Sequence, residues 1–208
     1  MMDLNLYVAF TGVVILLAIT PGTDNLYILT RALSEGRRAG FLAALGIAFG
    51  LMVHITAATL GLSQVFKNAP VAFSVIRWAG IVYLAWLAYQ AWQTRVTKIS
   101  TAKNPAPLGQ VKIIRDAMTL CLLNPKLLLF FIAFLPQFTN PAVGSMNVQF
   151  FILGVTFAVE SLTVFVLAVI FVAPLGGYLR QHPQFWNRQG KVTGVVLGAM
   201  ALTLAVFG

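Results

Sequence analysis

Long apolar stretches run through this chain, and short polar segments separate them. About 20 consecutive apolar residues are enough to cross the hydrocarbon core of a bilayer. The pattern therefore predicts an all-α membrane protein with six transmembrane helices, over residues 3–32, 39–66, 71–92, 112–138, 146–172 and 192–207.

Two of the six predicted helices are broken. Pro21-Gly22 interrupts the first apolar run, and Asn124-Pro125 interrupts the fourth. Proline lacks an N–H and clashes with the preceding turn, which costs roughly 3 kcal/mol in a helix interior. A plain kink is one interpretation of the first break. Asp24 and Asn25 follow it directly, however, and a kink needs no carboxylate.

The two halves of the chain show signs of an internal repeat. Three pairs of residues lie 104 positions apart: Pro21 and Pro125, Gly40 and Gly144, and Gly50 and Gly154. Three helices per half is an odd number, so the second half must enter the membrane from the opposite side. We expect an inverted repeat, with residues 1–92 as the first three-helix unit, 93–111 as a cytoplasmic linker and 112–208 as the second unit. In transporters of this design, the site lies on broken helices near the midplane.

Composition and charge fit a membrane protein. Hydrophobic residues make up 59% of the chain and charged residues 9%, against about 25% charged in soluble domains. The net charge of +9 would suit nucleic acid, but the basic residues lie at the ends of apolar runs, as topology signals do. No nucleic-acid partner is therefore expected.

The basic residues also predict the orientation. Most follow the first, third and fifth predicted helices: Arg31, Arg37, Arg38, Arg95, Lys98, Lys103, Lys112, Arg115, Arg180, Arg188 and Lys191. The opposite side holds Lys67 and Arg77. Cytoplasmic loops carry the excess of Lys and Arg, so this predicts a multi-pass protein with both termini outside. The N-terminus lacks the basic region of a secretory signal, which favours an uncleaved first helix.

Charged residues follow both breaks. If the halves pack about a pseudo-two-fold axis, Asp24 and Lys126 approach each other and complement the ammonium and carboxylate of an amino acid. Backbone N–H groups after the breaks add donors for a carboxylate. A structural ion pair without a ligand is the alternative. The candidate substrate-binding residues are Pro21, Gly22, Thr23, Asp24, Asn25, Asn124, Pro125 and Lys126.

Three ionisable residues are candidates for proton coupling: Asp24, Glu160 and His54. Glu160 is the only charge in the fifth predicted helix, and burial disfavours the charged form of a carboxylate. It either exchanges protons or only hydrogen-bonds a neighbouring helix. His54 lies one turn after Gly50 within the membrane, where ionisable groups are often functional. A neutral packing histidine is the alternative. Glycines four residues apart, in the second and sixth predicted helices, most simply mark packing faces.

Several function classes lack a signature. The chain has no GxxxxGK[ST], HExxH or GxSxG pattern, so neither ATP-driven transport nor a membrane enzyme is supported. One cysteine, Cys121, excludes an intrachain disulfide. One Cys and two His do not make a soft-metal cluster. We expect no enzyme activity, no metal site and no cofactor.

Three motifs resemble those of a known family. The run from Thr20 to Asn25, continued by Leu33-Ser34-Glu35-Gly36-Arg37-Arg38-Ala39-Gly40 and residues 46–50, resembles the first signature of the LysE/RhtB amino-acid exporters. Asn124-Pro125-Lys126, with Phe130-Phe131 and residues 135–138, is similar to the second, and Trp78-Ala79-Gly80 with Tyr83-Leu84 looks like the third-helix pattern. The family usually has Pro-Gly-Pro at the first break, and here the third position is Thr23.

The resemblance implies two inverted three-helix repeats and proton-driven export of amino acids from the bacterial cytoplasm. One acid and one base near the breaks suit a neutral amino acid such as threonine, homoserine or a leucine-like substrate. A basic amino-acid or cation exporter of the same family is an alternative. So is a non-transporting, channel-like or interaction protein whose glycine stripes mediate homo-oligomer formation. The expected partners are the substrate, protons and the bilayer of the inner membrane.

Overall fold

The computed structural model describes residues 2–19, 22–62, 70–93, 108–171 and 183–207. All regular secondary structure in these ranges is helical, which confirms the predicted all-α class. The α-helices are α1 (Leu4–Ile19), α2 (Thr23–Glu35), α3 (Arg37–Ala57), α5 (Pro70–Gln93), α6 (Gln110–Leu122), α7 (Pro125–Leu129), α8 (Met146–Phe171) and α10 (Pro183–Phe207). Two π-helical turns, η1 (Ala58–Leu62) and η2 (Phe130–Phe134), and one 3-10 turn, η3 (Leu135–Phe138), complete them.

Two helical segments bend where the sequence predicts breaks. The axis turns by 50° between α1 and α2, and by 47° between α6 and the segment from α7 to η3. Thr20 and Pro21 lie outside the described residues. The second bend contains Leu123 and Asn124, directly before Pro125. Each bend leaves two short half-helices, and α2 and α7 both begin at a break.

Two continuous helices are long and apolar enough to cross a membrane, Arg37–Gly61 and Met146–Phe171. Each bent pair also passes as one span, which gives four in the described part of the chain. The described part of α10 holds a shorter apolar stretch, Gly190–Thr203. Six spans were predicted. That α5 and α10 are the other two membrane-spanning helices therefore stays a prediction.

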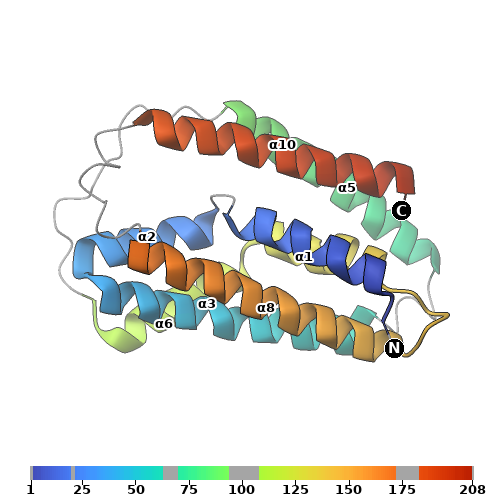
Figure 1. Ribbon diagram of the computed structural model, residues 1–208, viewed down its shortest axis with the longest axis horizontal. Coiled ribbons are helices and arrows are strands. Elements are labelled where there is room, and N and C mark those ends of the chain that lie inside the picture. Colours follow the sequence, from blue (N-terminus) through green and yellow to red (C-terminus); the bar gives the residue numbers. More distant parts are fainter. Residues whose placement is uncertain (1, 20–21, 63–69, 94–107, 172–182, 208) are drawn as a thin grey trace.

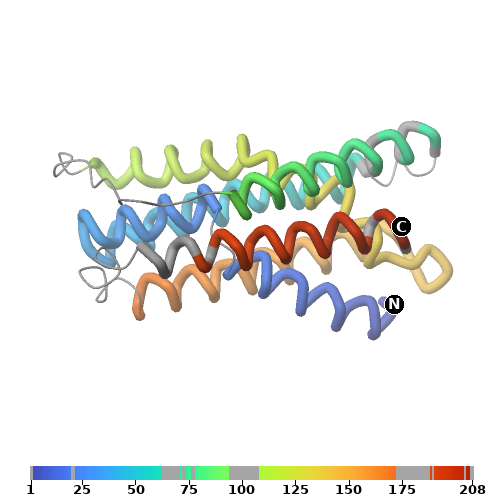
Figure 2. The backbone as a smooth tube through the Cα atoms, turned by 90° about the horizontal axis from the view of Figure 1, so that it is seen from above, coloured from blue at the N-terminus to red at the C-terminus, as the bar shows by residue number. Residues whose placement is uncertain are grey.

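Figure 1 shows how the helices are arranged. Helices α5 and α10 lie side by side as an antiparallel pair, while α3 packs against α2, α6 and α8. The segment from α1 to α2 runs from the end that holds both termini toward the opposite end, and α6 to η3 runs back (Figure 2). Helices α3 and α8 are likewise antiparallel. Corresponding helices of the two halves therefore point in opposite directions.

Helix boundaries at the basic end differ from the sequence prediction. Residues 33–38 lie between the first two predicted helices, but α2 continues to Glu35 and α3 starts at Arg37. Gly36 alone turns the chain, with a φ of 89°, a backbone conformation that favours glycine. Helix α10 begins at Pro183 instead of residue 192, so Arg188 and Lys191 lie in the helix and not in a loop. Proline is well suited to a first helical position.

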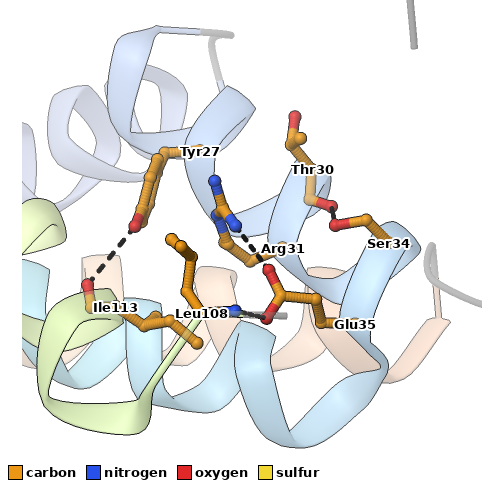
Figure 3. Close-up of polar contacts among 7 residues, drawn as sticks. All are labelled: Tyr27, Thr30, Arg31, Ser34, Glu35, Leu108 and Ile113. Carbon is orange, nitrogen blue, oxygen red and sulfur yellow. Dashed lines mark hydrogen bonds and ion pairs between the residues drawn. The ribbon is translucent and has the colours of Figure 1, made fainter. Parts of the chain in front are cut away.

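A polar cluster ties α2 to the start of α6 (Figure 3). The Tyr27 hydroxyl donates to the carbonyl of Ile113 over 3.5 Å. Arg31 pairs with Glu35, and the second carboxylate oxygen of Glu35 accepts the backbone N–H of Leu108 over 2.9 Å. This end of the bundle is thus closed by hydrogen bonds between the two halves of the chain.

The glycine stripes are packing faces, as the sequence suggested. A Cβ on Gly46 would lie 2.4 Å from the Ile114 carbonyl oxygen of α6, and one on Gly50 would lie 2.6 Å from the Cβ of Cys121. On α10, a Cβ on Gly194 would lie 2.9 Å from a carbonyl oxygen of α5. The stripes are therefore used within one chain.

Candidate functional site

Asn124 joins the two breaks. Its side-chain oxygen accepts the backbone N–H of Lys126 over 3.0 Å and so caps the start of α7. Its amide nitrogen donates to Asp24 Oδ2 at the start of α2, over 3.1 Å. Asn and Asp are strong N-capping residues, which explains why the chain turns into a helix here. The same side chain then fixes the position of a buried carboxylate 100 residues away.

Asp24 and Lys126 line one cavity from opposite halves of the chain. Each is the second residue of a half-helix, α2 or α7. Their charges act on each other, yet the ion pairs among the described residues are Arg31–Glu35 and Arg115–Asp116. Among those residues the Lys126 ammonium makes neither a hydrogen bond nor an ion pair. Asp24 and Lys126 therefore line the same cavity, and the structure shows no ion pair between them.

The first break leaves donors near the cavity. The N-cap of α2 is Gly22, which offers no side-chain cap, so the first backbone N–H groups of α2 lack that partner. A Cβ on Gly22 would lie 3.5 Å from Lys126 Nζ, so the ammonium reaches close to this backbone. Helix N-termini favour anions. An ammonium and a helix N-terminus therefore meet at the same side of the cavity.

Two further candidates at the break are engaged within the protein. The Asn25 amide donates to the carbonyl of Ala18 over 2.8 Å and so satisfies an acceptor at the end of α1. The Thr23 hydroxyl donates to Asp24 Oδ1 over 3.3 Å. Pro125 starts α7, where its missing N–H costs little. Pro21 lies outside the described residues. Of the eight predicted residues, Asp24 and Lys126 carry the charge that faces the cavity.

The rest of the cavity wall was not predicted from the sequence. Ile47 and Leu51 contribute from α3, and Phe157, Ser161 and Phe165 from α8, with Leu17, Ala18 and Leu127 beside the breaks. The lining residues of α3 are four residues apart, and so are those of α8, which places each of these two groups on one face of its helix. That spacing is the only signal in the sequence that these residues act together. The empty volume is about 380 Å³, a figure that includes open space at the mouth of the cavity.

His54 packs outside this cavity. Its Nε2 lies 3.1 Å from the carbonyl oxygen of Cys121, and its ring stacks on Phe131 with centroids 5.7 Å apart. The residue is 8% exposed. These contacts favour the packing interpretation that the sequence left open.

Glu160 faces α1 and does not line the cavity. Its carboxyl group interacts with Thr11, and Oε2 is buried without a hydrogen-bond partner among the described residues. One turn earlier, the hydroxyls of Tyr7 and Thr156 lie 3.1 Å apart. Polar side chains of α1 and α8 thus contact each other at two successive helical turns. In the sequence, Glu160 directly precedes Ser161, which lines the cavity.

A family model described as LysE type translocator matches residues 15–208. This chain belongs to the LysE family. The resemblance of the two break motifs is thereby confirmed, and efflux, not catalysis, is the class of activity that membership supports. No solved structure matches this LysE-family chain.

Two relatives cover almost the full length. An uncharacterized membrane protein of Vibrio cholerae serotype O1 is 29% identical over 205 residues, 98% of each chain. A leucine efflux protein of Klebsiella pneumoniae subsp. pneumoniae is 27% identical over 199 residues, which are 96% of this chain and 94% of the relative. The chain is thus similar, over nearly all of its length, to one relative described as a membrane protein and to another described as an efflux protein.

Proposed function

We propose that this LysE-family protein is a secondary active exporter of neutral amino acids. The observation that carries the proposal is the placement of Asp24 and Lys126, which bring one negative and one positive charge to the wall of a single cavity. A zwitterion satisfies both: its ammonium binds Asp24, and its carboxylate binds Lys126 and the uncapped start of α2. The leucine efflux relative agrees with a neutral substrate.

The charge balance also separates this proposal from export of basic amino acids or cations. A second cationic group on the substrate needs a second carboxylate in the cavity. Glu160 is the nearest in sequence to a lining residue, but it faces Thr11 on α1. The channel-like alternative uses the glycine stripes for association between copies, whereas Gly46, Gly50 and Gly194 pack against other helices of the same chain. A neutral zwitterion is therefore the substrate class that we propose.

Export from proteoliposomes tests the site. Purified protein is reconstituted with a labelled neutral amino acid inside, and the initial efflux rate is measured. We expect Asp24→Asn and Lys126→Ala to abolish efflux, because each removes one of the two charged anchors. Asp116→Asn and Lys112→Ala are matched controls on α6, outside the cavity, and should retain the rate. Efflux that survives both site variants would refute the assignment.

We further propose antiport against protons, with Asp24 and Glu160 as the exchanging carboxyls. Asp24 is buried at the start of α2, and Glu160 is partly buried in the apolar helix α8, where its Oε2 lacks a partner among the described residues. Burial favours a neutral carboxyl, which makes protonation accessible. Glu160→Gln should uncouple efflux from an imposed pH gradient while counterflow at equal pH persists. A variant that responds to the gradient as the wild type does would exclude Glu160.

The proposed architecture is six spans in two inverted repeats, with the basic end of the bundle in the cytoplasm of a bacterium. It is supported by the antiparallel directions of corresponding helices and by the basic residues at the ends of α2, α3 and α6. Reporter fusions to the C-terminus test the orientation: an outside terminus activates alkaline phosphatase and leaves a fluorescent protein dark.

A further inference from the structure

Ser161 contributes a hydroxyl group to the cavity wall, and this hydroxyl has no hydrogen-bond partner among the described residues. Ser161 is 2% exposed, lines the cavity from α8, and makes no hydrogen bond with the residues that the structure describes. Serine and threonine within helices commonly bond the carbonyl four residues earlier. Four other hydroxyls in the described helices do so: Ser34, Thr56, Thr163 and Thr203. Ser161 departs from that pattern where the wall faces the empty space.

The surroundings of Ser161 are apolar. Phe157 lies one turn before it and Phe165 one turn after, and both line the cavity from the same face of α8. Ile47 and Leu51 line it from α3. The polar lining residues other than Ser161 all belong to the two breaks. If the charged ends of a zwitterion bind there, its side chain must extend along the apolar walls, where Ser161 supplies the single hydroxyl.

We propose that Ser161 is a specificity-determining residue of this site and distinguishes hydroxylated from purely aliphatic substrate side chains. The proposal rests on the proposed function and adds to it. A hydroxyl group on the substrate side chain forms a hydrogen bond with the Ser161 hydroxyl, whereas an aliphatic side chain leaves that hydroxyl without a partner. An unpaired buried polar group is costly, and sites that hydrogen-bond a substrate hydroxyl discriminate against analogues that lack it. The Phe157 and Phe165 rings limit the size of the side chain by their bulk.

Threonine and valine are the probes, because they have nearly the same shape and differ by a hydroxyl in place of a methyl group. Initial efflux rates of each are measured from proteoliposomes under one fixed gradient, for the wild type, Ser161→Ala, Ser161→Thr and Thr163→Val. We expect the wild type to prefer threonine. Ser161→Ala should shift the threonine-to-valine ratio about 2- to 12-fold toward valine, the range that one neutral hydrogen bond supplies.

The other two variants separate specificity from general damage. Ser161→Thr keeps a hydroxyl at the position and should keep the preference for threonine. Thr163→Val removes an exposed hydroxyl that bonds its own helix and should leave the ratio unchanged. A wild-type preference for valine, or a ratio that is the same in Ser161→Ala, would overturn the role of Ser161 while leaving export intact. Absence of efflux of any neutral amino acid from the wild type would refute the proposed function and the subsite with it.

Discussion

Replacing Asn124 with aspartate tests the link between the two breaks. Aspartate keeps the side-chain oxygen that caps Lys126 but puts a second carboxylate oxygen where the amide nitrogen now lies, 3.1 Å from Asp24 Oδ2. The lost hydrogen bond to a charged group contributes about 1.5–3 kcal/mol. At an effective dielectric constant of about 20, two unit charges at that separation repel by about 5 kcal/mol, which is an upper bound for the added cost.

The assay is apparent thermal unfolding of purified protein in detergent. For a chain of this size, each 1 kcal/mol lowers the midpoint by about 2–4 °C, so loss of the hydrogen bond alone should lower the midpoint of Asn124→Asp by roughly 3–12 °C, and the repulsion should lower it further. Asn124→Ser retains a capping oxygen and loses the amide N–H that donates to Asp24, without adding a charge, so its midpoint should fall between those of the wild type and Asn124→Asp. The deficit of Asn124→Asp should shrink as the pH is lowered, because protonation of one carboxyl removes the repulsion.

The exchanged pair makes the prediction refutable. In the double variant Asp24→Asn with Asn124→Asp, a donor again faces an acceptor, so stability should recover by several kcal/mol relative to Asn124→Asp. The double variant should not export, because its carboxylate lies on α7 instead of at position 24 of α2. If Asn124→Asp unfolds at the wild-type temperature, or the double variant is no more stable than Asn124→Asp, the bridge does not connect the two halves as inferred.

Three further predictions concern packing, the end of the bundle and orientation. Gly46→Ala should prevent accumulation of folded protein in the membrane, because the added Cβ would lie 2.4 Å from a backbone oxygen of α6. The control Gly61→Ala should accumulate normally, because a Cβ at Gly61 has open space around it. Glu35→Ala should lower the stability by about 1–3 kcal/mol in thermal unfolding, because Arg31 and the Leu108 N–H both lose a largely buried acceptor; loss of the exposed pair by Arg115→Ala should cost less than about 1 kcal/mol. Reversing the charge of the basic residues on α3 and α6 should lower the fraction of chains inserted with the C-terminus outside, as read from the two reporter fusions.

The helical elements could largely be predicted from the hydrophobic pattern alone. The lengths of the apolar runs fixed the class, and Asn124-Pro125 and Pro21-Gly22 predicted where the helices bend, because proline removes a donor and glycine or asparagine allows a turn or a cap. The errors fell where polar residues continue a helix. Residues 33–35 and 183–191 include several polar side chains, but their one proline, Pro183, stands at a first helical position. A pair such as Arg31 and Glu35, four residues apart, also stabilises a helix.

Within the site, the sequence by itself determined the residues next to the breaks, and Asp24 and Lys126 stood out because charges in lipid are costly and therefore rarely without purpose. Only the tertiary structure decided their relation. It showed that Asn124 binds Asp24 and caps α7, that Asn25 satisfies a carbonyl of α1, and that Ser161 faces the cavity without a partner. A helical face recurs every 3.6 residues whether it meets lipid, another helix or a cavity, so one sequence cannot tell which face of α3 or α8 lines the site. That choice is made by packing between segments 100 residues apart.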